Sequence, residues 1–352
     1  MIDISSIFKK KNLLLSFTLI VIAILIIYSA LFTPIFSETN EEEKEIDEED
    51  WHNYPYVIPG TDMRFPDEEG LYTEGPETWI SVGFKLELQD FEWDDLYMVI
   101  LYHETYKNVY LSHNEGTYLG GNAGEQNLPI GELDMTFDNF EQDTLKDILS
   151  VKEGEAFNYE FKSYFELEDR EFEIDIELDA KKPPATMTDF NGRVDLGDEH
   201  YKFHALTHCD IVGTITIDDV VLDAEGVGWV ENLRGSFRDI EWQWFAFWDR
   251  NNIDMKIVDA YGGEDNIQYS MYVDEKGDII TIDDISINVT SFKNGFGYSW
   301  EITSEEYPIE LNITCIDERM NYGWFAFGFG RINGELMGEK IDTLTYIELT
   351  NR

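Results

Sequence analysis

A glutamate stands two positions after a tryptophan in residues 226–249, which read GVGWVENLRGSFRDIEWQWFAFWD. Alternate residues of a strand share a face, so Trp229 and Glu231 are expected to lie side by side. In an enclosed apolar space the pKa of this carboxyl would rise, and Glu231 could then act as a general acid near neutral pH. Aromatic faces could stabilise a cation formed by that proton transfer. Alternatively, Glu231 lies in water at a strand end and the tryptophans are ordinary core.

The following strand is aromatic on both faces, so we expect both faces to be covered. One face carries Trp242, Trp244, Ala246 and Trp248, and the other carries Gln243, Phe245, Phe247 and Asp249. One cover would be another layer of core, and the other would be the lumen of a barrel, with or without a ligand. Residues 322–329, YGWFAFGF, repeat this pattern, and Tyr346 and Glu348 are expected to share a face.

Three histidines raise the question of a metal site. If residues 200–208 form a strand, then His200, His204 and His208 point the same way and Cys209 lies on the opposite face. At about 3.3 Å per residue the outer pair is roughly 26 Å apart, and a helix would still leave about 12 Å. We therefore expect neither a metal nor another cofactor, and we expect His204 to line the barrel lumen.

The net charge excludes one class of partner. The 352 residues contain 25 Lys and Arg against 73 Asp and Glu, a formal net charge of −48. Such a chain repels phosphate backbones, so nucleic-acid binding is not expected. The acidic surface suits either a salty environment or the binding of cations, although the sequence lacks the spacing of an EF-hand loop. With 43% hydrophobic residues, the chain can form a substantial core.

The N-terminus predicts a membrane anchor. Three lysines at 9–11 precede a mostly apolar run, which predicts a transmembrane helix over residues 13–36. The basic residues place 1–12 in the cytoplasm and the folded part outside, in a single-pass protein of the cell membrane. Residues 37–55 would then form an acidic stalk. A cleaved signal peptide is the alternative, but the apolar run is long and lacks an evident cleavage site.

Two cysteines and two sequons suit an extracellular location. A disulfide between Cys209 and Cys315 would close a loop of about 100 residues and stabilise the fold by about 4 kcal/mol. Two buried thiols are the alternative. Asn288 and Asn312 begin the glycosylation sequons NVT and NIT.

Strand patterns dominate from residue 77 onward and predict an all-β fold. Residues 171–178, EFEIDIEL, alternate strictly between apolar and acidic side chains, as a half-exposed antiparallel strand does. Many such runs separated by turns indicate barrels or sandwiches. The best helical candidate is 144–153. The adjacent prolines in 181–199 divide the folded part into domains over 56–190 and 191–352.

Several segments together resemble the carotenoid 1,2-hydratase (hydroxyneurosporene synthase) and AttH-like, lipocalin-like family. They occur in the family's order and are PETWISVGFKLEL (76–88), KKPPATMTDFNG (181–192), HYKFHALTHCDIVGTI (200–215), GVGWVENLRG (226–235), WQWFAFWDRNNIDMKI (242–257) and TYIELT (345–350). The resemblance implies two consecutive calycin-like, or lipocalin-like, antiparallel β-barrel domains.

The resemblance also implies a function and a set of site residues. Some members bind or transform apolar, often isoprenoid, molecules, and in the hydratases an acid protonates a carbon–carbon double bond before water captures the cation. Glu231 takes the position of the family's aspartate. The pocket walls implied by the resemblance are Trp79, Tyr201, Trp229, Trp242 and Trp244.

Departures from the family pattern affect the activity more than the fold. Asn232 stands where the family has histidine, and Glu231 is one methylene longer than the family's aspartate. Thr78 and Ile80 replace aromatic residues of the first motif. The family resemblance is therefore a stronger guide to the fold of this chain than to its reaction.

Three functional hypotheses follow from the sequence. The first is a membrane-anchored, extracellular lipocalin-like protein that binds an apolar ligand, such as an isoprenoid or another lipid, in a β-barrel. The second is a hydratase that acts on an isoprenoid double bond through Glu231. The third is a structural protein of the cell envelope without a ligand.

Overall fold

The computed structural model describes most of the chain from Asp50 onward. The described residues are 50–53, 55–65, 68, 77–88, 91–93, 95–103, 106–113, 117–119, 135–136, 139–142, 147–151, 156–167, 169–187, 191–236, 239–248, 253–262, 265–316 and 325–350. The expected transmembrane helix over 13–36 lies outside them. No helix within these ranges has the length and apolar character of a membrane span.

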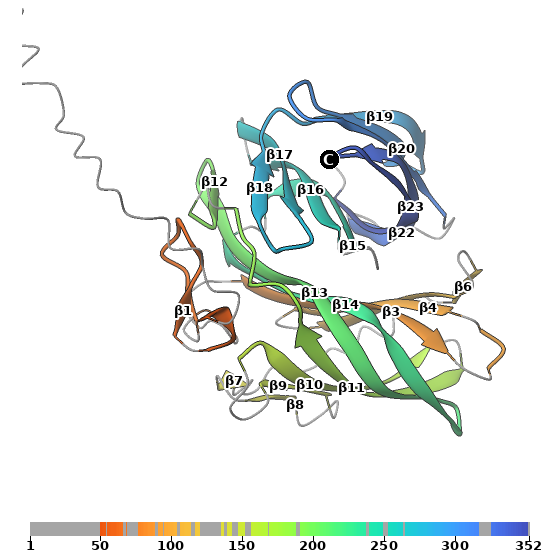
Figure 1. Cartoon of the computed structure of the whole chain (residues 1–352). Helices are drawn as coiled ribbons and strands as arrows, with labels where there is room; N and C mark the ends of the chain where they lie inside the picture. Colours follow the sequence, from red (N-terminus) through yellow and green to blue (C-terminus); the bar gives the residue numbers. More distant parts are fainter. Residues whose placement is uncertain are drawn as a thin grey trace, which may run out of the picture. The chain divides into compact units, whose positions relative to one another are not determined.

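Two curled antiparallel sheets make up the described part of residues 50–352 (Figure 1), which form one compact unit. This arrangement agrees with the expected two-barrel, lipocalin-like architecture, each sheet being a half-barrel. A short hairpin of β1 (Tyr56–Val57) and β2 (Arg64–Phe65) follows the 3-10 turn η1 (Asp50–His52).

The first sheet contains twelve strands within the described residues, in the order β6-β5-β4-β3-β14-β13-β11-β10-β9-β8-β7, with β12 paired to β13. Their bounds are β3 (Glu77–Leu88), β4 (Asp95–His103), β5 (Tyr106–His113), β6 (Thr117–Leu119), β7 (Met135–Thr136), β8 (Asn139–Gln142), β9 (Asp147–Val151), β10 (Asn158–Leu167), β11 (Arg170–Ala180), β12 (Arg193–Leu196), β13 (Glu199–Ile217) and β14 (Val220–Ser236).

The second sheet contains nine strands within the described residues, in the order β18-β17-β16-β15-β23-β22-β21-β20-β19. Their bounds are β15 (Glu241–Trp248), β16 (Asp254–Gly262), β17 (Asp265–Val273), β18 (Ile279–Ile282), β19 (Ser286–Lys293), β20 (Phe296–Thr303), β21 (Ile309–Cys315), β22 (Phe325–Leu336) and β23 (Glu339–Thr350).

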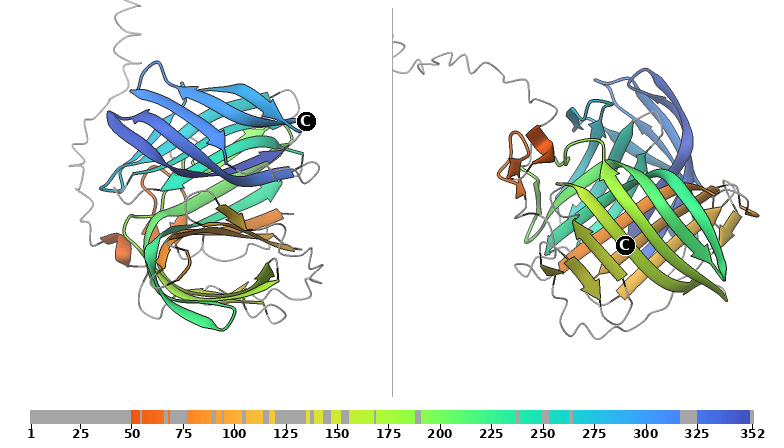
Figure 2. Two further views of the ribbon diagram at one scale, coloured as in Figure 1. Left: turned by 90° about the vertical axis from the view of Figure 1, so that its right-hand side faces the viewer. Right: turned by 60° about the horizontal axis from the view of Figure 1, so that its bottom comes forward.

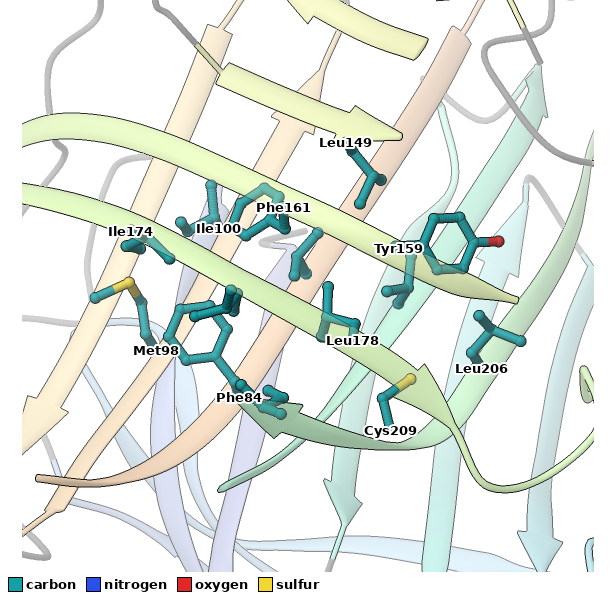
Figure 3. Packing of buried hydrophobic residues seen from close by; sticks show 14 of the residues in the cluster. Phe84, Met98, Ile100, Leu149, Tyr159, Phe161, Ile174, Leu178, Leu206 and Cys209 are labelled. Atoms are coloured by element: carbon teal, nitrogen blue, oxygen red, sulfur yellow. The ribbon is translucent and has the colours of Figure 1, made fainter. Parts of the chain in front are cut away.

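Side chains fill the inside of each curl. In the first sheet Phe84 and Met98, from β3 and β4, lie opposite Phe161 and Ile174, from β10 and β11 (Figure 3), and all four are buried. The strict alternation of β11 produces this arrangement, because its apolar residues are buried and most of its acids are exposed. The second curl encloses its own apolar cluster, which includes Phe245, Trp300 and Ile347.

A third apolar cluster lies between the two sheets. The outer faces of β3, β4, β13 and β14 pack against those of β15, β16, β17 and β23, and the sheets stack as two layers in Figure 2. As expected, β15 is covered on both faces: Trp242, Trp244 and Trp248 belong to this third cluster, whereas Phe245 and Phe247 belong to the cluster of the second curl.

The change of sheet does not fall where the prolines led us to place it. We expected halves over 56–190 and 191–352, but β12, β13 and β14 belong to the first sheet, which ends at Ser236. The prolines interrupt the chain only between β11 and β13, and these two strands still pair from Phe172↔Ile217 to Ala180↔Cys209. The second sheet begins at Glu241.

Two further expectations require correction, and the open question of the cysteines is decided in favour of buried thiols. The helix expected over 144–153 is wrong for 147–151, which form β9; β9 pairs with β10 and buries Leu149, so tertiary pairing overrides local propensity. The stalk expected over 37–55 ends earlier, since Trp51 is buried against Phe157. Cys209 and Cys315 are buried thiols in separate clusters and do not form a disulfide. The sequon residues Asn288 and Asn312 are exposed.

If the first curl is a packed core, shortening a side chain inside it should lower the free energy of unfolding far more than shortening an exposed side chain. Phe161→Ala is expected to lower the free energy of unfolding by about 3–5 kcal/mol, because the cavity cannot close fully. Phe292→Ala is the matched control, since Phe292 is 70% exposed, and it should change the free energy by less than about 0.5 kcal/mol. Urea denaturation measures both, and equal effects would show that the first curl is hollow.

Candidate functional site

The expected glutamate and tryptophans meet between the two sheets, not in a barrel lumen. On β14, Val227, Trp229, Glu231 and Leu233 alternate along the face that turns toward the second sheet. Gly226, Gly228 and Val230 occupy the other face, and Val230 packs into the first curl. We placed the pocket inside a barrel, and this placement is wrong because the first curl is filled by other side chains.

A small cavity separates the sheets beside Glu231. Its lining residues are Trp79, Ser81, Tyr201, Glu231, Leu233, Ile240, Trp242, Trp244, Val258, Ala260 and Glu348. The free volume is about 20 Å³, which is enough for about one water molecule. A second, smaller cavity of about 10 Å³ lies alongside and is lined in part by Trp229, Trp248 and Lys256. The walls of the first cavity are mostly apolar and include four aromatic rings, and its carboxyl groups are those of two glutamates.

Glu231 forms an ion pair with Lys256 of β16 across the gap between the sheets. Both side chains are almost completely buried, at 7% and 5% exposure. The Lys256 ammonium also lies over the ring of Trp229, 4.7 Å from its centroid, and 5.5 Å from that of Trp244. Burial lowers the pKa of Lys256 well below its ordinary value, and the charge of Glu348 opposes this shift. Since Glu231 is paired, it does not meet the description of an isolated, protonated acid.

Glu348 of β23 meets that description better. Burial raises its pKa from 4.5 to about 7, against hydrogen bonds from Tyr346 and Trp242 and the charge of Lys256. The Tyr346 hydroxyl donates to Glu348 Oε1 at 2.6 Å. A substantial fraction of Glu348 therefore carries a proton at neutral pH, in a cavity lined by indole rings.

Aromatic contacts hold the cavity walls in place. The ring of Trp79 meets that of Trp242 edge to face, with centroids 5.4 Å apart, and this contact joins β3 to β15. The hydroxyls of Tyr201 and Tyr269 are 2.7 Å apart, on strands of different sheets. Burial raises the pKa of Tyr201, so both tyrosines remain neutral hydrogen-bonding groups.

Six of the expected site residues lie on this inter-sheet face and one does not. Trp79, Tyr201, Glu231, Trp242 and Trp244 line the larger cavity, and Trp229 lines its neighbour. His204 lies on the opposite face of β13, where its ring meets Phe65 edge to face at 5.0 Å. Burial and the charges of Arg234 and Lys256 lower the pKa of His204 to about 3.

A β-bulge explains why the histidines do not align. The register of β13 against β14 shifts between Leu206 and Cys209, so the residues after the bulge exchange faces. His204 and Cys209 consequently face the first curl, whereas His208 faces the second sheet and lies 3.3 Å from Asp254. Within the described ranges, no group of three or more His, Cys, Asp or Glu residues is placed to hold a metal ion.

Asp254 belongs to a second buried ionic cluster. Lys182, from the segment with the prolines, donates to Asp254 Oδ2 at 2.7 Å and to the carbonyl of Val273 at 3.3 Å. His208 approaches the other carboxylate oxygen. This cluster connects β13 and the segment before it to the second sheet, and its charges are balanced by several partners.

The sequence did not lead us to Lys256 as a site residue, and Glu348 was predicted only to share a face with Tyr346. In β16, Met255 and Ile257 pack into the second curl while Val258 and Ala260 pack between the sheets, so Lys256 is a charge within a strand buried on both faces. Glu348 has the same setting in β23, between Ile347 and Leu349. A charged residue inside such a strand is the signal that would have identified both.

Asn232 shows why one departure from the family pattern has little direct effect on the cavity. It follows Glu231 in a strand, so its side chain points to the opposite face, where it is buried. The residue that partners the glutamate comes instead from β16 of the other sheet.

Comparison with solved structures places the chain in an AttH-like, lipocalin-like fold. An AttH candidate from Nitrosomonas europaea superposes with a TM-score of 0.58 at 14% identity, over 84% of this chain and 98% of that one. Kievitone hydratase from Nectria haematococca gives 0.52 at 12% identity, over 78% and 88%. At these identities the likeness concerns the fold alone. No protein-family profile matches the sequence, and no curated protein matches it.

The pKa of Glu348 predicts a pH-dependent stability difference. Its folded pKa is raised, so the stabilisation is complete below the unfolded value of 4.5 and is lost as the pH rises through about 7. Relative to Glu348→Gln, the free energy of unfolding of the parent should therefore fall by about 2 kcal/mol between pH 5.5 and 8.

Urea denaturation of both proteins at the two pH values measures this difference, and comparing them cancels the effect of the net charge. A constant difference would show that Glu348 is solvated in the folded state. Glu310→Gln, at an exposed position of β21, is the control. Its free energy of unfolding should differ from that of the parent by the same amount at both pH values.

Proposed function

We propose that the inter-sheet cavity is the binding site for an apolar small molecule, such as an isoprenoid or another lipid. Support comes from its indole walls and its position between two rigid sheets. The cavity has room for about one water molecule, so a larger ligand must displace side chains that line it. Ile240, in the connection between the sheets, is one wall that does not belong to a strand.

The finer form of the proposal is acid-catalysed addition of water to a carbon–carbon double bond of that molecule. The observation that carries it is the Glu348 carboxyl, buried beside indole rings with a pKa of about 7. Glu348 donates the proton, the faces of Trp242 and Trp244 stabilise the carbocation, and water captures it. One of the structural neighbours described above is a hydratase by name. Glu231, which the family resemblance favoured, is then not the proton donor, because it contacts Lys256.

One comparison of variants distinguishes catalysis from binding without a reaction. The full-length protein in detergent is incubated with geranylgeraniol in ¹⁸O-labelled water, and products are followed by mass spectrometry. A labelled alcohol is expected, with Glu348→Gln slowing its formation by roughly 10²–10⁴-fold. Glu310→Gln is the control and should match the parent. Retention of geranylgeraniol without labelled product would leave binding as the function, and turnover by Glu348→Gln at the parent's rate would exclude Glu348 as the acid.

We also propose that residues 13–36 anchor the protein in the cell membrane with residues 56–352 outside. The lysines at 9–11, the apolar run and the acidic segment after it support this orientation. Protease added to intact cells should remove the folded part, whereas a tag at the N-terminus should remain protected until the cells are lysed. Protection of both ends would contradict the orientation.

A further inference from the structure

We propose that Lys256 and Glu231 become joined by an amide bond between the lysine Nζ and the glutamate Cδ, an intramolecular cross-link between the two sheets. This inference is independent of the proposed function, because it concerns the covalent structure of the chain. It would tie β14 to β16 at the centre of the buried layer.

The first support is the contact itself. Lys256 Nζ and Glu231 Oε2 touch, and both side chains are buried at 5% and 7% exposure. The two residues reach each other from opposite sheets, so the packing of the sheets fixes their approach. Such positioning gives an intramolecular reaction a high effective concentration.

The surroundings of Lys256 favour the neutral amine, which is the nucleophilic form. Aromatic rings of Phe203, Trp229 and Trp244 lie within 4.7–5.9 Å of Nζ and exclude water. In β15 the residue opposite Lys256 is Ala246, whose small side chain leaves space for the lysine to extend across the strand. A desolvated lysine of this kind is activated for attack on a carbonyl carbon.

A second carboxyl is present to supply the proton that the reaction needs. Ala246 also pairs with Tyr346, and Trp244 pairs with both Val258 and Glu348. Glu348 therefore lies two strands from Lys256 and two residues along the strand direction. Glu231 and Glu348 line the same cavity, and Lys256 and Glu348 are close enough for their charges to interact. Burial raises the pKa of Glu348 to about 7, which keeps part of it protonated.

The step balances without an oxidant or another reactant. Within the pair, a proton first passes from the Lys256 ammonium to the Glu231 carboxylate, which gives a neutral amine and a carboxylic acid. The amine attacks Glu231 Cδ, the new C–N bond forms, and the Glu231 hydroxyl leaves as water. Glu348 protonates the leaving oxygen and regains its proton from the nitrogen, so it ends as a carboxylic acid. The product replaces a buried ion pair with a neutral amide, and this change removes the cost of desolvating two charges. Glu348 remains available as the proton donor of the proposed function.

Two other lysine–acid pairs in the same chain serve as internal controls. Lys182 and Asp254 are also buried and 2.7 Å apart, but His208 and the Val273 carbonyl give this pair further polar partners. Lys162 and Asp175 are 2.7 Å apart at the exposed surface, where water reaches both groups. We expect both of these pairs to remain unlinked.

Peptide mapping of the full-length protein tests the link directly. Trypsin cannot cleave after an acylated lysine, so residues 251–276 should stay intact and be joined to residues 203–234. The joined species has the mass of both peptides less one water, and its fragment ions assign the bond to Glu231 and Lys256. Recovery of 203–234, 251–256 and 257–276 as separate peptides from the parent would overturn the proposal.

Variants then test the chemistry. Lys256→Arg keeps the charge but cannot form the amide, so the joined species should disappear, whereas Lys162→Arg should retain it. Glu348→Gln is expected to lower the joined fraction at least ~10-fold, and Glu348→Asp should restore part of it because a carboxylic acid is again present. A joined fraction in Glu348→Gln equal to that of the parent would contradict the role of Glu348 as the proton donor.

Discussion

The burial of three ionisable groups between two apolar sheets is the constraint on which the rest of this structure depends. Removing a charge from water costs several kcal/mol, and the interior must compensate with opposite charge, hydrogen bonds or a change of protonation. Lys256 and Glu231 compensate each other, and Glu348 compensates by holding a proton, because burial raises its pKa more than the hydrogen bond from Tyr346 lowers it. Loss of one partner of such a pair would leave an uncompensated charge, at a cost of about 3–5 kcal/mol.

Both sheets form the buried layer between them, because each sheet contributes one face to it. Each curl encloses its own apolar cluster, and the outer faces supply the indole rings and the charges of this layer. The long strands β13 and β14 are central to this arrangement, since they face the first curl with one side and the second sheet with the other. The bulge in β13 adds His208 to the inter-sheet side and keeps His204 away from it.

Much of the fold could be predicted from alternation, since β11 and β15 follow their sequence patterns residue by residue. The face shared by Trp229 and Glu231 was predicted in the same way. The partner of that face could not be, because period-two patterns assign a residue to a side of a strand but not to a neighbouring sheet. The bulge was hidden for a related reason: one extra residue inverts the alternation without a distinctive sequence signal. Lys256 was missed because its partner comes from β14, in the other sheet.

The central claim is that a carboxyl remains protonated at neutral pH inside the inter-sheet layer. Infrared spectroscopy of the full-length protein measures this most directly, because a protonated carboxyl has a C=O stretch separate from that of carboxylates. The account predicts a band that titrates with a midpoint near pH 7 and is absent from Glu348→Gln. Absence of a protonated-carboxyl band above pH 5 in the parent, or the same band in Glu348→Gln, would contradict it.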